Sequence, residues 1–167
     1  MKGYQVLMQS FVGHGVSCIF GNPGTTENPL LEGLIDTPGI IYYMALHEGV
    51  AVTAASFYAQ ASGKTGVVNL HVAPGLGNGL GSLYGAFKAN SPLLITAGQQ
   101  DTRMRLRTPL LSHDLVSMAA PLTKWSAEAQ HVNEIAPLLR RAFKIAHEAP
   151  NGSGVLGASS RCHVTGD

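Results

Sequence analysis

The stretch GVVNLHVAPGLGNG, residues 66–79, joins a short apolar run to a histidine and a glycine-rich segment. Its first part, 66–70, has the length and valine content of a buried strand, and a helix is expected after it over 75–89. The same alternation recurs along the chain. Strands are expected at 16–20, 40–46, 66–70 and 92–98, and helices within 1–15 and at 26–34, 47–61, 75–89 and 133–147. This order predicts an α/β fold, a three-layer sandwich with a mainly parallel central sheet and helices on both faces.

The glycines after the third strand do not form a phosphate-binding motif. Gly75 and Gly77 begin a G-x-G pattern, but position 80 is leucine where the pattern requires a third glycine. The Lys-Ser/Thr ending of a P-loop is absent as well. The small residues at 73–81 instead indicate a helix that packs closely on a sheet, on a partner helix or on a cofactor ring.

The composition limits the partners that this chain can have. Charged residues make up 13%, below the usual value of about 25%, so we expect part of the surface to be covered by another chain or domain. The net charge of +1 and the lack of charge blocks argue against nucleic acid, and no apolar run is long enough to span a membrane. The two cysteines, Cys18 and Cys162, form no disulfide framework, and the N-terminus lacks a signal-peptide pattern, so a cytoplasmic location is expected.

Polar residues follow the first three expected strands. The segments are GNPGTTE at 21–27, LHEG at 46–49 and LHVAPG at 70–75. Because the carboxyl ends of parallel strands meet at one edge of a sheet, we expect these segments to lie together and to form a ligand site. The first of them, Asn22-Pro23-Gly24 with Thr25 or Thr26 as a helix cap, can equally be a plain strand-helix turn.

Glu48 and His71 are the candidate catalytic residues of this edge. Glu48 lies in a segment that is otherwise apolar or small, so it is either a buried carboxyl that exchanges a proton with a ring nitrogen or a helix-start glutamate that faces water. His71 is either a general acid-base or a structural histidine. No metal-ligand spacing recurs among the 7 histidines, so no metal site is expected in this chain.

Taken in order, several segments resemble the N-terminal, pyrimidine-binding domain of thiamine-diphosphate-dependent enzymes, especially benzoylformate decarboxylase-like 2-oxo acid decarboxylases. The resemblance rests on FGNPGTTENPLL (20–31), ALHEGVAVTAASFYAQASGK (45–64), VNLHVAPGLGNGLGSLYGAFKANSPLLITAGQQ (68–100) and PLTKWS (121–126). Motifs in the same order over most of the chain are more specific than any one of them.

The resemblance implies a role for each residue of the candidate edge. Glu48 is expected to bond N1′ of the aminopyrimidine, and Asn22, Pro23 and Gly24 to lie against the cofactor. Thr25 stands where the decarboxylases have a serine near the substrate carboxylate. His71 matches their proton-transfer histidine, which acetolactate synthases generally lack, and therefore favours a decarboxylase, a carbon-carbon lyase.

The resemblance also implies that this chain holds only the aminopyrimidine end of thiamine diphosphate. Enzymes of this family bind Mg²⁺ and the diphosphate through a Gly-Asp-Gly motif on a separate domain, and the sequence contains no such motif. We therefore expect an isolated chain to be inactive, a diphosphate-binding domain or subunit as partner, and a homodimer or higher oligomer. Two alternatives stay open: the small subunit of a split decarboxylase or acetolactate synthase-like enzyme, and a non-catalytic dimerising domain.

The sequence divides into a pyrimidine-binding domain at 1–152 and a divergent tail at 153–167. Members of the resembled family continue here with a strand such as GPVFLALPRDVM, whereas this chain reads SGVLGASSRCHVTGD. Codons for part of the tail, read one base out of register, can spell the family strand. The hypothesis is a frameshift near residue 153, which sequencing of the coding DNA tests, and the alternative is a divergent, flexible terminus.

Overall fold

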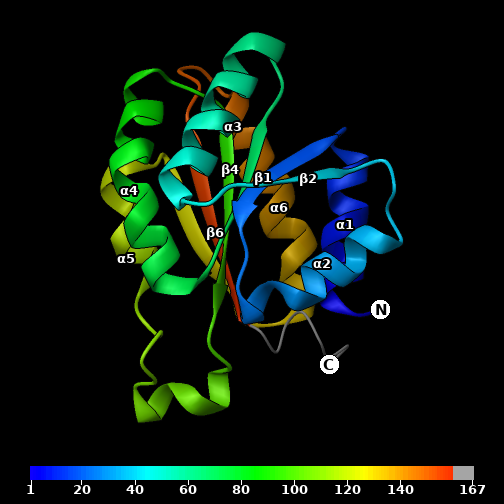
Figure 1. Cartoon of the computed structure of the whole chain (residues 1–167), viewed down its shortest axis with the longest axis vertical. Helices are drawn as coiled ribbons and strands as arrows, with labels where there is room; N and C mark the ends of the chain where they lie inside the picture. The colour runs from blue at the N-terminus through cyan, green and yellow to red at the C-terminus, as the bar shows by residue number, and fades with distance from the viewer. Residues whose placement is uncertain (160–167) are drawn as a thin grey trace.

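A six-stranded sheet forms the centre of the computed structural model, which describes residues 1–159. The strand order is β2-β1-β3-β4-β6-β5, and every neighbouring pair is parallel (Figure 1). The strands are β1 (Cys18–Asn22), β2 (Ile41–Met44), β3 (Gly66–Leu70), β4 (Leu93–Gln99), β5 (Trp125–Ala129) and β6 (Ser153–Ser159). The predicted parallel α/β sheet is confirmed.

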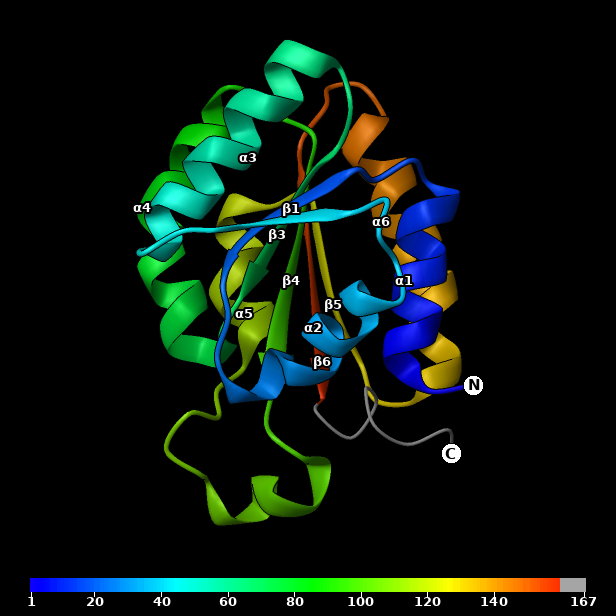
Figure 2. The same ribbon diagram turned by 45° about the vertical axis from the view of Figure 1, so that its right-hand side comes forward.

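Helices cover both faces of the sheet. They are α1 (Gly3–Gly13), α2 (Asn28–Ile35), α3 (Glu48–Ser62), α4 (Val72–Lys88), α5 (Leu115–Ala119) and α6 (Val132–His147), with short 3-10 turns at Thr25–Glu27, Thr102–Arg107 and Ala120–Leu122. Figure 2 shows α3, α4 and α5 on one side of the sheet and α1, α2 and α6 on the other, which is the predicted three-layer sandwich. Within the described residues, no helix combines the length and the hydropathy needed to cross a membrane.

Two apolar clusters fill the spaces between the layers. One joins α1, α2 and α6 to the sheet and includes Phe11 and Leu139, and the other joins α3, α4 and α5 to it and includes Val52 and Leu83. Strands β3 and β4 are buried along their whole length because both of their faces are covered. Burial on both faces explains why these strands contain continuous runs of valine, leucine and isoleucine, which predict a buried strand.

Two helix starts differ from the expected positions, and both differences bear on the site. The helix expected at 26–34 begins with the 3-10 turn Thr25–Glu27, and its α-helical part starts at Asn28. The helix expected from residue 75 starts at Val72, directly after His71. Pro74 is tolerated in its first turn because the backbone N–H groups there have no helical partner to lose.

Strand β6 begins within the segment that the sequence analysis separates as a tail. Ser153–Ser159 pairs with β4 on one side and β5 on the other, so these residues belong to the same sheet as the preceding ones. The glycines Gly154 and Gly157 made this strand hard to recognise, because glycine is depleted in strands. The remaining tail, 160–167, which includes Cys162, lies outside the described residues.

Candidate functional site

The ends of β1 and β3 and the start of α3 meet at the carboxyl edge of the sheet. Asn22 is the last residue of β1, His71 follows β3, and Glu48 is the first residue of α3. Side-chain hydrogen bonds join these segments: Asn22 bonds Glu48, and Thr26 bonds His71. The expectation that the three polar segments lie together is therefore met.

Glu48 is a buried carboxylate held by two amide groups. Its exposed fraction is 6%. Asn22 Nδ2 donates to Oε1 at 3.2 Å, and Asn78 Nδ2, from α4, donates to Oε2 at 3.1 Å. Each oxygen keeps a further lone pair, so the carboxylate can still bond a ring nitrogen. Of the two sequence interpretations, the water-facing glutamate is wrong, because burial and two side-chain donors fix this group inside the edge.

His71 is paired with an acidic residue that the sequence analysis did not single out. His71 Nδ1 lies 2.7 Å from Oε2 of Glu27, whose exposed fraction is 3%. The same Oε2 accepts the backbone N–H of Gly24 at 2.8 Å. A protonated Nδ1 donates to this carboxylate, which leaves Nε2 as the ring nitrogen outside the pair.

The two threonines of the first turn have different positions. Thr26 Oγ1 contacts Nδ1 of His71 at 3.2 Å and also donates to Oε1 of Glu27. Thr25, the predicted substrate contact, is exposed, and Pro23 beside it is half-buried. The expected threonine cap is wrong, because Glu27 occupies the N-cap position of α2 and no side-chain cap bond is made there.

Two glycines permit the close packing around Glu27 and His71. A Cβ at Gly24 would overlap the imidazole ring of His71, and a Cβ at Gly98, on β4, would overlap the carboxylate of Glu27. Larger residues at these positions would push the pair apart. Gly24 belongs to the turn that is predicted to lie against a cofactor. A glycine is required there because any side chain would overlap the ring of His71.

The corner between β3 and α4 is strained at Val72. Its φ angle is 42°, in the left-handed region that β-branched residues avoid, and its side chain is fully buried. Such a conformation costs on the order of 1–3 kcal/mol and persists where the surrounding structure holds it. Here the buried side chain anchors the corner and so fixes the position of the preceding His71.

A buried polar network lies behind the pair. Tyr42 Oη donates to Oδ1 of Asn69 at 3.2 Å, and Nδ2 of Asn69 donates to Oγ1 of Thr96 at 3.1 Å. Burial, and secondly the negative charge of Glu27, raise the pKa of the Tyr42 phenol. The network stabilises the middle of the sheet beneath the candidate site.

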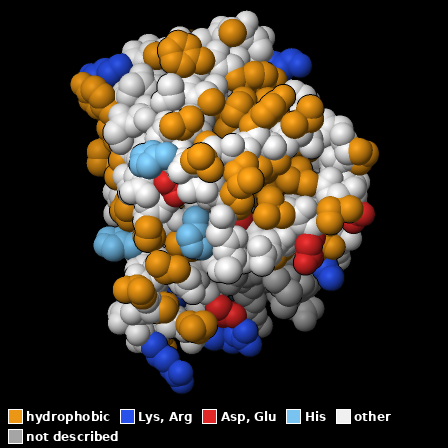
Figure 3. All heavy atoms as spheres, in the orientation of Figure 1, with side chains coloured by type: hydrophobic (Ala, Val, Ile, Leu, Met, Phe, Trp, Pro, Cys, Tyr) orange, Lys and Arg blue, Asp and Glu red, His pale blue; other side chains and the backbone are white. Residues whose placement is uncertain are grey.

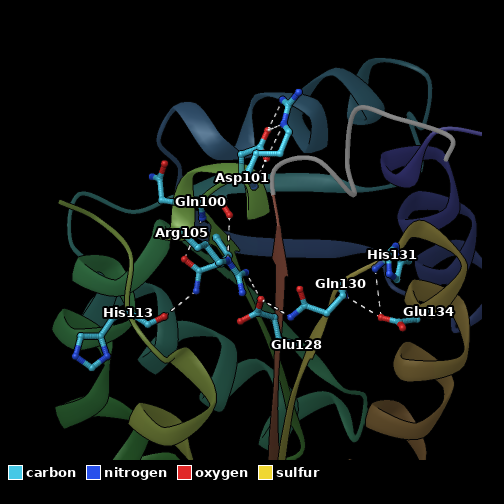
Figure 4. A network of polar contacts seen from close by, with 10 residues as sticks. Gln100, Asp101, Arg105, His113, Glu128, Gln130, His131 and Glu134 are labelled. Carbon is cyan, nitrogen blue, oxygen red and sulfur yellow. Dashed lines mark hydrogen bonds and ion pairs between the residues drawn. The ribbon is translucent and has the colours of Figure 1, made fainter. Parts of the chain in front are cut away.

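The segment after β4 is anchored to the sheet, although the sequence is typical of a solvated loop. Arg105 forms an ion pair with Glu128 of β5, and Gln99 Nε2 donates to the carbonyl oxygen of His113 at 2.7 Å (Figure 4). Gln130 Nε2 also donates to Glu128, at 3.0 Å. These contacts hold residues 100–114 beside the carboxyl ends of β4 and β5.

No group of three or more His, Cys, Asp or Glu side chains within residues 1–159 is arranged to hold a metal ion. The groups that meet at this edge are the carboxylates of Glu27 and Glu48, the imidazole of His71 and the amides of Asn22 and Asn78. At this edge, one carboxylate can bond a ring nitrogen, and an imidazole paired with a second carboxylate lies nearby.

Comparisons with known proteins show what this chain is similar to. Residues 1–118 match the family described as "Thiamine pyrophosphate enzyme, N-terminal TPP binding domain". Benzoylformate decarboxylase of Pseudomonas aeruginosa is 38% identical over 148 residues, 88% of this chain and 27% of that protein. The acetolactate synthase large subunit of Lactococcus lactis subsp. lactis is 31% identical over 151 residues, 90% of this chain and 26% of that protein.

A solved structure agrees over the whole sheet. The thiamine diphosphate-dependent 4-hydroxybenzoylformate decarboxylase of Rhodococcus jostii RHA1 has a TM-score of 0.93 and 30% identity, over 99% of this chain and 31% of that one. This chain spans about a quarter of the length of the curated relatives described above.

Proposed function

Because the chain belongs to the thiamine pyrophosphate enzyme family, as its N-terminal TPP-binding domain, we propose that it is the aminopyrimidine-binding half of a 2-oxo acid decarboxylase. The observation that carries the proposal is the carboxylate of Glu48, buried at the sheet edge between the amides of Asn22 and Asn78. A buried carboxylate with spare lone pairs suits a ring nitrogen that exchanges a proton.

The residues at the edge fit the aminopyrimidine end of the cofactor. Glu48 would bond its ring nitrogen, and the turn Asn22-Pro23-Gly24 would lie against the ring. The thiazolium of the bound cofactor supplies the electron sink for loss of carbon dioxide from a 2-oxo acid. His71, oriented by Glu27, would hold and move a proton near the substrate, and Thr25 would lie near the substrate carboxylate.

The acid-paired histidine supports a decarboxylase over an acetolactate synthase. A carboxylate 2.7 Å from Nδ1 fixes the tautomer and the orientation of the ring, as a proton-transfer group requires. A module that only dimerises needs no buried carboxylate such as that of Glu27 beside a histidine, and burying a carboxylate is costly. The synthase relatives are comparably similar overall, so the product of the reaction is the discriminating observation.

We propose that the diphosphate and its Mg²⁺ are held by another domain or subunit. An exposed apolar surface supports such a partner: Ile41, Met44, Leu46, Val50 and Phe57 on β2, α3 and their link are each more than half exposed. Figure 3 shows hydrophobic side chains gathered on the face that carries β2 and α3. A second copy of the chain or the diphosphate-binding part would cover this surface in a homodimer or higher oligomer.

Calorimetric titration with thiamine and with thiamine diphosphate plus Mg²⁺ tests the half-site. We expect weak binding of similar strength for both ligands, because this chain contacts only the ring they share. Glu48→Gln should abolish this binding, whereas Glu32→Gln, at an exposed position on α2, should leave it unchanged. Tight binding that needs the diphosphate and Mg²⁺ would contradict the half-site, and unchanged binding by Glu48→Gln would remove Glu48 from it.

Complementation with a diphosphate-binding domain tests the reaction. The combined protein should release carbon dioxide from an aromatic 2-oxo acid and form the aldehyde, and Glu48→Gln and His71→Ala should each reduce this rate by at least about 100-fold. Formation of acetolactate from pyruvate would favour the synthase alternative. Decarboxylation that is unaffected by either substitution would support the non-catalytic domain.

A further inference from the structure

A hollow lies at the end of the molecule opposite the candidate site. Its volume is about 580 Å³, and it is lined by the residues that directly follow α1, by the link that follows α3 and by the carboxyl-terminal half of α6. The candidate site lies at the carboxyl ends of the strands, whereas this hollow lies near the amino ends of β1 and β3. A ligand in it would therefore not touch Glu48 or His71.

The hollow concentrates the positive charge of a chain that has little charge. Lys64, Arg140 and Lys144, three of the 11 lysines and arginines, line it together with His14 and His147. No aspartate or glutamate is among its lining residues. Because the net charge of the whole chain is only +1, this is a local concentration and not a general basic character.

Favourable interaction of cations with the carbonyl groups at a helix C-terminus explains only part of this positive charge. Lys144 and His147 lie in the last turn of α6, where cations favour the exposed carbonyl groups, and Lys144 also pairs with Glu148 at 3.4 Å. Arg140 lies about two turns before the end of α6, beyond the range of that effect. Within residues 1–159, neither Lys64 nor Arg140 has a carboxylate in salt-bridge distance.

The imidazole groups of the hollow are held in fixed positions. The ring of His14 stacks on Phe143 with a centroid distance of 4.2 Å and an angle of 9°. Its Nδ1 lies 2.8 Å from the carbonyl oxygen of Ser10 and so donates a hydrogen to it, while Nε2 of His147 bonds the Thr65 hydroxyl at 2.8 Å. The exposed imidazole of His14, backed by the buried ring of Phe143, forms a wall beside the cationic groups, here called the His14–Phe143 wall.

We propose that this hollow binds a small phosphorylated molecule, with its phosphate monoester between Lys64, Arg140 and Lys144 and its organic part on the His14–Phe143 wall. Guanidinium and ammonium groups bind phosphate through charge-assisted hydrogen bonds, which arginine can make in pairs. The volume lies within the range of about 300–1,000 Å³ that is usual for small-molecule sites. The proposal is independent of the function assigned to the sheet edge.

Titration of the full chain with inorganic phosphate and with phenyl phosphate, at low and constant ionic strength, tests this site. Both should bind saturably, and phenyl phosphate should bind more tightly because its ring can lie on the exposed imidazole of His14. Arg140→Gln and Lys64→Gln should each weaken phosphate binding by about 10-fold, the loss expected for one charge-assisted hydrogen bond. Lys88→Gln, a cation on α4 outside the hollow, should leave it unchanged, and so should Glu48→Gln.

Circular dichroism of each variant shows whether the fold is retained, and variants of other positions in the hollow can replace one that does not fold. The proposal is overturned if phosphate fails to saturate, or if Lys88→Gln weakens it as much as Arg140→Gln does. It is also overturned if chloride displaces bound phosphate as effectively as phenyl phosphate displaces it. Binding of a short polyglutamate peptide without any binding of phosphate would likewise overturn it and would indicate an acidic protein partner.

Discussion

Glu27 Oε2 lies 2.7 Å from Nδ1 of His71 and 2.8 Å from the backbone nitrogen of Gly24, so one buried carboxylate ties the first turn of the site to the end of β3. Its other oxygen accepts the hydroxyl of Thr26. A carboxylate taken from water is stable only when such donors surround it. The position of His71 therefore depends on a residue in a different segment of the chain.

Replacing Glu27 should destabilise the fold and release the histidine. Glu27→Ala leaves the Gly24 N–H and the imidazole without their acceptor, and we expect a loss of about 2 kcal/mol in the free energy of unfolding. Urea denaturation measures this loss. Nitrogen NMR of His71 should change from the single Nδ1-protonated tautomer to a mixture.

Glu32→Ala is the matched control for this experiment, because Glu32 is exposed on the next helix. It should change stability by less than about 0.5 kcal/mol. Equal stability of the two variants, or an unchanged His71 tautomer in Glu27→Ala, would contradict the positioning role of Glu27.

A methyl group at Gly98 should disturb the same pair from the neighbouring strand. In Gly98→Ala the new Cβ overlaps the carboxylate of Glu27 and the hydroxyl of Thr26, so one of them has to move. We expect a loss of about 1–3 kcal/mol, the usual cost of overpacking. Gly85→Ala, at an exposed helical position with no atom within 4 Å of its Cβ, should instead gain about 0.5–1 kcal/mol. Thermal denaturation distinguishes the two signs, and a stabilised Gly98→Ala would show that the packing is looser than described.

The sequence predicts those parts of the fold in which the residue pattern of a single segment is enough to indicate its structure or role. The runs of valine, leucine and isoleucine in β3 and β4 are buried on both faces, and Glu48 and His71 stand out as polar residues among apolar ones. Glu27 and Asn78 do not stand out, because their roles come from partners 44 and 30 residues away in the chain. One signal for Asn78 was available: it is a polar side chain within a run of small residues.

Strands β5 and β6 are not predicted from the sequence. Most of their residues are small, polar or charged, and only Trp125, Val155 and Leu156 are large and apolar, so neither the period nor the apolar content of a typical strand is visible. Gly154 lacks a side chain of its own, and a Cβ there would lie near the indole of Trp125 and near Ala142 of α6. The side chains that fill the core beside Gly154 therefore belong to other segments, so the sequence around Gly154 does not indicate a buried strand.

Removing residues 153–167 should prevent the chain from folding cooperatively. Strand β6 lies between β4 and β5, so a chain that ends at Gly152 leaves β5 without its neighbour and exposes the long edge of β4. Circular dichroism and a urea titration should show loss of the cooperative transition. A truncated chain that unfolds like the full one would place the end of the domain at 152.

Two glycine substitutions test the packing of β6. In Gly154→Ala the new methyl group lies in ordinary van der Waals contact, 3.6 Å from the Trp125 carbonyl oxygen and 3.9 Å from Ala142 Cβ. Alanine loses less chain entropy than glycine on folding, so we expect a gain of about 0.5–1 kcal/mol. In Gly66→Ala, on β3, the methyl group overlaps the backbone carbonyl of Ala55, and a loss of about 1–3 kcal/mol is expected. Similar effects of the two substitutions would contradict the described contacts of β6.

The phenol of Tyr42 should make the fold sensitive to alkaline pH. Burial, and then the charge of Glu27, raise its pKa in the folded state above the ordinary value of about 10. The stability that this group contributes is therefore fully present below pH ~10 and is lost as the pH rises through the raised pKa of the folded state. Over that range the unfolded chain ionises while the folded chain keeps its proton, so unfolding should become easier by up to about 1.4 kcal/mol per pH unit.

Tyr42→Phe isolates this contribution. At pH 8 the variant should differ from the parent by about 1 kcal/mol, since it lacks the hydrogen bond from Tyr42 to Asn69. Between pH 10 and 11 the parent should lose stability faster than the variant, and the gap between them should shrink or reverse. Urea titrations at each pH give this difference directly, with phenolate absorbance as a second measurement of the ionised tyrosines. A gap that stays constant from pH 8 to pH 11 would mean that Tyr42 ionises alike in the folded and unfolded chains, contrary to its burial beside Glu27.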